Sequence, residues 1–303
     1  VVVVDDLSGG YLKNLKKGYK RLYIVDCSSS RQMDKIFKAE KPDTVFHLAA
    51  NAAENKAQFS PVDITSRNFD AFIKVLVPFI RYGGKHFIFV SSIAVYGALQ
   101  TPFKETAKPE PEDLYGISKL AAEQSLRVMS EVHGFGYVIT RLHNVFGPRQ
   151  NMTDPYRNVV TIFMNSLLEG KAYHIYGDGN QTRQFSYIDD VVSALVRCTS
   201  SKVNRMVFNV GSGYPRTINQ LSDAIQEISG VRIKPRYLPK RPQEVKIALA
   251  SHTLAKKYLG YRERVKFKDG LKITWDWAQK QGPQKLKKTK VEIMSEKLPR
   301  NWK

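Results

Sequence analysis

The chain has 303 residues, of which 42% are hydrophobic and 25% are charged. This length is enough for one large domain or two smaller ones with a substantial core, and the hydrophobicity excludes a disordered chain. No apolar run approaches the ~20 residues of a membrane-spanning helix, and two cysteines, Cys27 and Cys198, cannot form a disulfide framework. We therefore expect a globular protein of a reducing compartment, the cytoplasm.

The net charge of +20 is distributed unevenly along the chain. Residues 1–150 carry 20 Lys and Arg against 15 Asp and Glu, whereas residues 151–303 carry 28 against 13. A basic half favours anionic ligands, such as phosphorylated small molecules or nucleic acid, although a solvated lysine-rich surface gives the same balance. Much of the excess lies in residues 282–303, which predict a basic and partly disordered tail.

Short apolar strands alternate with helical patterns in the first half. The predicted strands are Val1–Val4, Leu22–Val25, Thr44–Leu48, Phe87–Val90 and Tyr137–Thr140, and the predicted helices are 31–40, 67–82 and 114–133. The last two helices end at glycines, which accept a left-handed conformation. Uniformly apolar strands indicate a parallel sheet that helices cover on both faces. The pattern predicts an α/β, doubly wound, Rossmann-like domain over residues 1–150.

The pattern is less regular after residue 150. Helices are expected at 155–169, 189–200, 217–229, 252–259 and 267–280, with a strand at Met206–Val210 and a turn at Gly177-Asp178-Gly179. These elements predict a smaller mixed α/β substrate lobe over residues 151–281, from which about 186–212 return to the first domain.

Carboxylates close the first two predicted strands, at Asp5 and Asp26. In dinucleotide-binding sheets a carboxylate in the place of Asp5 accepts hydrogen bonds from the adenosine ribose and repels a 2′-phosphate, which favours NAD; a cap of the turn is the alternative. Asp26 is placed to face the adenine. The glycine-rich phosphate loop of such sheets does not occur in the sequence. We expect that the chain starts inside the fold, after its first strand and loop.

Tyr115 and Lys119 are four residues apart, so both side chains lie on one face of a predicted helix. A neighbouring ammonium stabilises phenolate, so we expect Lys119 to lower the pKa of Tyr115 and make it a general base toward a hydroxyl group. Ser92, at the carboxyl end of a predicted strand, is placed to orient that hydroxyl. Taken singly, these residues also suit an amphipathic helix pair and a strand-end cap.

With these motifs the chain resembles the extended short-chain dehydrogenase/reductase superfamily, in particular nucleotide-sugar epimerases of the UDP-glucose 4-epimerase type. The resemblance implies NAD as cofactor, a nucleoside-diphosphate sugar as substrate, transient oxidation at C4, and a homodimer through the helices near 67–82 and 114–133. It implies cofactor contacts from a set of residues at strand ends and on two helices, namely Asp5, Asp26, Cys27, Leu48, Ala49, Ala50, Asn68, Tyr115 and Lys119.

The resemblance also implies a substrate site, made by Ser92, Asn144, Arg183, Arg241, Glu244 and Ala248. Independently of the family, a guanidinium presents a planar fork of donors, so Arg183 and Arg241 suit a diphosphate. The small side chain of Ala248 implies room for an N-acetyl group on the sugar.

Several other functions are disfavoured. Relatives that dehydrate their substrate carry an acidic pair after the active-site hydroxyl residue, where this chain has Ile93 and Ala94. This disfavours a nucleotide-sugar dehydratase or reductase, which stays as one alternative. A second alternative is an epimerase-like scaffold that binds RNA or another polyanion. Because a binding module has no use for the predicted catalytic set, a nucleic-acid partner is not expected. The six histidines lack the spacing of metal ligands, so no metal site is expected.

Overall fold

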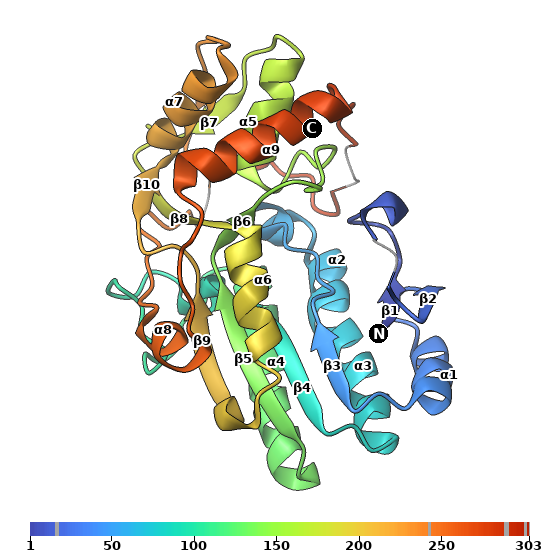
Figure 1. Ribbon diagram of the computed structural model, residues 1–303. Coiled ribbons are helices and arrows are strands. Elements are labelled where there is room, and N and C mark those ends of the chain that lie inside the picture. Colours follow the sequence, from blue (N-terminus) through green and yellow to red (C-terminus); the bar gives the residue numbers. More distant parts are fainter. Residues whose placement is uncertain (16–17, 242–243, 288–290, 300–301, 303) are drawn as a thin grey trace.

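The computed structural model describes residues 1–15, 18–241, 244–287, 291–299 and 302. At its centre is a four-stranded parallel sheet in the order β3 (Thr44–His47), β4 (His86–Ser92), β5 (Gly136–Leu142) and β9 (Met206–Val210) (Figure 1). Parallel pairing brings the carboxyl ends of all four strands to one edge of the sheet. The predicted α/β class is confirmed. None of the described helices is both long and apolar enough to cross a membrane.

Helices cover both faces of this sheet. On one face lie α1 (Ser30–Glu40), α3 (Ala71–Arg81) and α4 (Leu114–His133), and on the other α6 (Ile188–Arg197) and α8 (Thr253–Leu259). Successive strand residues point to opposite faces, so Phe87 and Phe89 of β4 pack with α3, whereas Ile88 packs with α6 and α8. The Phe79 and Phe87 ring centroids, for example, are 5.1 Å apart.

The first two strands form a sheet of their own. In the described chain, β1 (Val2–Asp5) and β2 (Arg21–Ile24) pair in parallel with each other and not with β3. The prediction that every strand is covered on both faces is wrong for this part, because the described residues of α6 and α8 pack on β4, β5 and β9 and not on β1 or β2. Ile24 and Phe46 are consequently 59% and 41% exposed, whereas Phe87, Ile88 and Phe89 of β4 are buried.

The predicted helix 67–82 is longer and interrupted. It consists of α2 (Pro61–Thr65), a π-helical turn, η3 (Ser66–Asp70), and α3. Asn68 lies in the π turn, where its side chain accepts a hydrogen bond from the Asn51 N–H and donates one to the Asn51 carbonyl, both at 3.0 Å. Such turns commonly place a side chain at a functional position. Asn68 therefore braces the segment after β3.

The second lobe lies over the carboxyl edge of the sheet (Figure 1). It holds a three-stranded sheet of β6 (Asn144–Phe146), β8 (Thr182–Tyr187) and β10 (Pro215–Thr217), a pair of β7 (His174–Tyr176) and β11 (Arg236–Leu238), and the helices α5 (Val159–Leu168), α7 (Ile218–Ser229) and α9 (Phe267–Gln281). Short 3₁₀ helices are η1 (Leu12–Asn14), η2 (Glu54–Phe59), η4 (Ile93–Tyr96) and η5 (Ser201–Val203).

The lobe strands were not predicted, since three to six residues carry too little periodicity. With α6 and β9 the chain returns to the first sheet; the domain limits themselves stay a prediction.

The segment after α9 is packed against the protein. Val291, Leu298 and Trp302 are buried, so the prediction of a partly disordered tail is wrong for the described residues. The apolar side chains spaced through this basic segment find partners in η2 and α2. Four basic residues of the predicted tail lie outside the described residues, namely Lys288, Lys290, Arg300 and Lys303.

Candidate active site

A cavity of about 840 Å³ lies where the carboxyl ends of β4 and β5 meet the second lobe. All the residues predicted to act on the substrate line it, namely Ser92, Tyr115, Asn144, Arg183, Arg241, Glu244 and Ala248. A cavity of this size with convergent polar groups at a sheet edge is where α/β proteins bind small ligands.

Tyr115 is positioned by the start of α4. The helix is capped by Asp113, whose carboxylate accepts a hydrogen bond from the Gly116 N–H at 2.7 Å. Gly116 lets the helix approach η4, because a Cβ at this position would come within 2.6 Å of the Ala94 carbonyl oxygen. This close approach places the Tyr115 ring beside Ser92.

The electrostatic surroundings of Tyr115 differ from the prediction. Burial raises the pKa of Tyr115 above its usual range, while a hydrogen bond with the Ser92 side chain lowers it. The charges of Glu54 and Asp113 raise the pKa further, and Arg157 lowers it. The expected lowering by Lys119 is wrong for this arrangement, because loss of solvation outweighs the favourable contacts of the phenolate.

Lys119 is 2% exposed and lies beneath the tyrosine. Its Nζ donates to the Val90 carbonyl at 2.8 Å, lies 4.9 Å from the centre of the Phe89 ring, and is 5.9 Å from the centre of the Tyr115 ring. Burial lowers the pKa of Lys119 to about 8, and the charge of Glu123 opposes this. The ammonium thus interacts with the two rings and a carbonyl.

The cavity also contains a basic cluster around one carboxylate. Arg241 Nη2 lies 2.9 Å from Glu244 Oε1, and Arg183 Nη2 lies 3.9 Å from the same oxygen. The Arg241 guanidinium stacks 4.3 Å from the centre of the Tyr176 ring. In the described structure Arg241 Nε and Glu244 Oε2 are buried without a hydrogen-bond partner. The cluster therefore keeps a surplus positive charge, as an anionic ligand requires.

Two further predicted residues complete the wall. Asn144, the first residue of β6, donates to the Gln184 carbonyl at 3.3 Å. Ala248 is buried beside Ile93 and Phe103. Pro242 and Gln243, which belong to the predicted Arg241–Glu244 motif, lie outside the described residues.

The remaining predicted cofactor residues lie outside the lining of this cavity. Asp5 and Asp26 each accept one backbone hydrogen bond at 2.7 Å through Oδ1, from Leu7 and Ser28 respectively. Both carboxylates thus cap turns, as the alternative interpretation predicted, and both remain exposed. Exposed carboxylates at the ends of adjacent parallel strands can accept hydrogen bonds from ribose hydroxyls, so these residues fit the adenosine half of NAD.

Other residues of the cofactor set are consistent with that fit. Leu48 and Ala49 are exposed directly after β3, and Ala50 is half-buried. Their short backbone stretch is held in place by the Asn68 contacts with Asn51. Burial raises the pKa of Cys27 to about 11, with the charges of Asp26, Asp6 and Asp5 acting in the same direction, so this thiol stays neutral beside the carboxylates.

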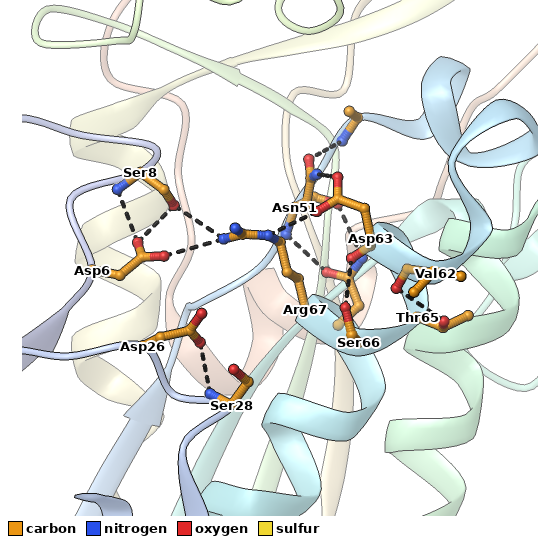
Figure 2. Close-up of polar contacts among 12 residues, drawn as sticks. Asp6, Ser8, Asp26, Ser28, Asn51, Val62, Asp63, Thr65, Ser66 and Arg67 are labelled. Atoms are coloured by element: carbon orange, nitrogen blue, oxygen red, sulfur yellow. Dashed lines mark hydrogen bonds and ion pairs between the residues drawn. The ribbon is translucent and has the colours of Figure 1, made fainter. Parts of the chain in front are cut away.

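An unexpected ion-pair bridge crosses this region. Figure 2 shows Arg67 of η3 between Asp6, which follows β1, and Asp63 of α2. Arg67 Nη1 lies 3.1 Å from Asp6 Oδ2, and Arg67 Nε lies 2.8 Å from Asp63 Oδ1. The bridge ties the loop after β1 to the helix that carries Asn68. Nothing in the sequence pattern singled it out.

Sequence reasoning missed several residues of the cavity wall. Glu54, Asp113, Tyr156, Arg157 and Trp302 all line the cavity. Burial raises the pKa of Asp113 to about 7, and the charge of Glu54 adds to this. The helix-cap position of Asp113, two residues before Tyr115, was a usable signal; the others carry none, because distant segments bring them here.

Comparisons with known proteins agree with this geometry. Residues 1–211 match the model of the NAD dependent epimerase/dehydratase family. The chain is 36% identical to a Thermotoga maritima UDP-glucose 4-epimerase solved with UDP-glucose, with a TM-score of 0.88 and 93% and 91% of the two chains covered. A Thermus thermophilus UDP-glucose 4-epimerase solved with NAD is 29% identical, with a TM-score of 0.84 and coverage of 91% and 90%.

Relatives known from sequence are more varied. A UDP-glucuronate 4-epimerase of Thermodesulfobacterium geofontis is 27% identical over 304 residues, covering 96% of this chain and 92% of the relative. Other matches include a UDP-N-acetyl-alpha-D-glucosaminuronate decarboxylase and a dTDP-D-glucose 4,6-dehydratase. The substrate and the exact reaction therefore differ within the set of relatives.

Proposed function

Because the chain belongs to the NAD-dependent epimerase/dehydratase family, we propose that it inverts the C4 hydroxyl of a UDP-sugar, either UDP-glucose and UDP-galactose or their N-acetyl forms. The cofactor is NAD. One observation carries the proposal: a single cavity holds Tyr115 and Ser92 together with the basic cluster of Arg183 and Arg241. The first pair can act on a hydroxyl group, and the cluster can hold a diphosphate.

In this proposal NAD, when bound, supplies reversible acceptance of a hydride. Tyr115 takes the proton of the C4 hydroxyl and later returns it, while Ser92 orients the sugar oxygen. Burial raises the pKa of Tyr115, so the first step, which needs the phenolate, depends on the groups that lower this pKa. Ser92 and Arg157 favour the phenolate that the first step needs. The basic cluster holds the nucleotide while the sugar turns over to present its other face.

The surroundings of Ser92 favour epimerisation over dehydration. Ile93 is buried among apolar residues, and Ala94 lines the cavity without a polar side chain. A dehydratase remains the second candidate, because Glu54 and Asp113 bring carboxyl groups to the same cavity, and burial raises the pKa of Asp113 to about 7. A dehydratase would yield a product that has lost one water.

The test is direct. Purified protein is denatured and the supernatant is assayed for NAD(H); intact protein then receives UDP-glucose and, separately, UDP-GlcNAc, and the sugars are analysed. Epimer formation by the wild-type protein, abolished in Tyr115→Phe, is the expected result. Normal turnover by Tyr115→Phe would refute the assignment of the base. Salt-sensitive retention of RNA, with no dinucleotide released, would instead support a binding scaffold.

We also propose a homodimer through α3 and α4. Ile117, Val128 and Val132 are exposed on α4, and their spacing places them along one face of the helix. Val77 on the neighbouring α3 is exposed as well. A two-fold pairing of these helices would bury this apolar stripe.

A further inference from the structure

The C-terminal segment crosses from the second lobe to the first domain. We define the C-terminal strap as residues 284–287, 291–299 and Trp302. It begins on α5, where the Gln284 N–H donates to the Asn165 side chain and the Asn165 amide donates to the Gln284 carbonyl, both at 2.8 Å. The Lys287 N–H then donates to the Thr153 carbonyl at 2.7 Å. These three bonds anchor the strap to the lobe.

The middle of the strap is fixed to the first domain. The backbone N–H groups of Glu292 and Ile293 both donate to the Phe59 carbonyl at 2.9 Å. The Glu292 carboxylate accepts from the backbone N–H groups of Val62 and Asp63, at 2.9 and 2.8 Å. Because these N–H groups start α2 and have no helical partner, the carboxylate acts as a cap supplied from a distant part of the chain.

The apolar side chains of the strap join the cluster that surrounds the reactive tyrosine. Val291, Leu298 and Trp302 are buried in one cluster with Tyr115 and Tyr156. The Trp302 indole meets the Tyr156 ring edge to face, with centroids 5.0 Å apart, and the Phe59 ring in the same way at 6.3 Å. Aromatic partners at these distances fix the orientation of the indole.

Trp302 also lines the 840 Å³ cavity together with Tyr115 and Ser92. The cavity keeps this volume with the indole present, so Trp302 forms part of its wall and does not fill it. The carbon-bound hydrogens of a pyranose ring make an apolar face, which an indole can cover while the hydroxyl groups face polar side chains. The basic cluster of Arg183, Arg241 and Glu244 is a separate part of the wall.

We propose that Trp302 contacts the sugar of the bound nucleotide sugar, and that the C-terminal strap is part of the active site. This inference rests on the proposed function, because it takes a nucleotide sugar as the ligand. It assigns Trp302 to the recognition of the sugar and leaves recognition of the nucleotide to the arginines.

The experiment compares UDP-glucose with UDP, which lacks the sugar, by isothermal titration calorimetry of the full chain. We expect Trp302→Ala to weaken UDP-glucose binding by about tenfold and UDP binding by less than about twofold. Trp302→Phe keeps an aromatic partner for Tyr156 and Phe59, so it should stay folded and lose about threefold on UDP-glucose alone. Trp277→Phe in α9 is the matched control and should change neither affinity; Trp277 does not line the cavity.

Three outcomes would overturn the inference. Equal weakening of UDP and UDP-glucose would assign Trp302 a structural role only. Unchanged or tighter UDP-glucose binding in both Trp302 variants would mean that the indole makes no useful contact or blocks the site. If the wild-type protein bound neither UDP nor UDP-glucose, the proposed function would fail together with this inference. If the wild-type protein bound both and the Trp302 variants kept the same affinities, the inference alone would fail.

Discussion

Glu123 of α4 and Arg141 of β5 form a bidentate ion pair within the core, where each side chain is 1% exposed. Arg141 Nε donates to Glu123 Oε1 at 2.9 Å, and Nη2 donates to Oε2 at 2.6 Å. Ser91 donates to the same carboxylate at 2.6 Å, and Arg141 donates to the Tyr96 hydroxyl at 2.7 Å. The pair therefore joins α4, β4, β5 and η4 directly behind the candidate site.

Breaking this pair should destabilise the protein strongly. Glu123→Gln leaves the Arg141 charge buried without compensation, so we expect the free energy of unfolding to fall by about 3–5 kcal/mol in urea titrations. Asp276→Asn is the control, since its partner Lys272 is exposed on α9, and it should cost less than about 1 kcal/mol. Equal losses in the two variants would show that the core pair contributes no more than a surface pair.

Lys119 should make stability depend on pH. Its pKa is about 8 in the folded protein against 10.5 when exposed, so the unfolded chain binds more protons between these values. The contribution of Lys119 to stability therefore increases as pH rises through this window, and below pH 8 the buried ammonium costs roughly 3 kcal/mol.

The variant Lys119→Met tests this prediction. Its free energy of unfolding should exceed that of the wild type by the largest amount below pH 8. This excess should diminish by roughly 3 kcal/mol as the pH approaches 10.5. Unfolding is measured in urea at several pH values in this range, with epimerase activity followed in parallel. We expect activity to be lost, because Lys119 belongs to the predicted cofactor contacts, although stability at neutral pH does not fall. A stability difference that is constant with pH would contradict the prediction.

Ala248 should control which sugars enter. Its side chain is buried in the cavity wall next to Ile93 and Phe103, so Ala248→Tyr adds a ring where an N-acetyl group would need room. We expect activity on UDP-GlcNAc to fall at least about tenfold while activity on UDP-glucose stays within about threefold. Ala248→Ser, which adds a single oxygen, is the control and should discriminate little. An equal loss on both substrates would argue against this gate.

The proposed dimer can be tested by changing one of the exposed apolar side chains of α4. Val132→Glu places a charge on the apolar face of α4 and should convert a dimer to a monomer in light scattering coupled to size-exclusion chromatography. Val196→Glu is the control, because Val196 is exposed on α6, on the opposite face of the sheet. A wild-type protein that elutes as a monomer would refute the dimer. A Val132→Glu protein that remains dimeric would exclude this face as the interface.

Local patterns in the sequence were sufficient for much of the architecture. The helix predicted at 114–133 and the strand predicted at Met206–Val210 have the observed bounds. The helix is long, begins after the Asp113 cap and ends at Gly134. Local patterns were also sufficient to predict that Ser92 and Tyr115 lie close together. Parallel strands place their carboxyl ends at one edge, so a residue at a strand end and one at the start of the next helix meet there.

What the sequence determined by itself was the order of elements and the residues that their periodicity brings to the sheet edge. The tertiary structure decided the high pKa of Tyr115, the bridge from Arg67 to Asp6, the separate pairing of β1 with β2, and the position of Trp302 in the cavity wall. Each of these depends on burial or on contacts between segments far apart in the chain. Local spacing cannot encode them, because desolvation and distant contacts arise only when the whole chain has packed.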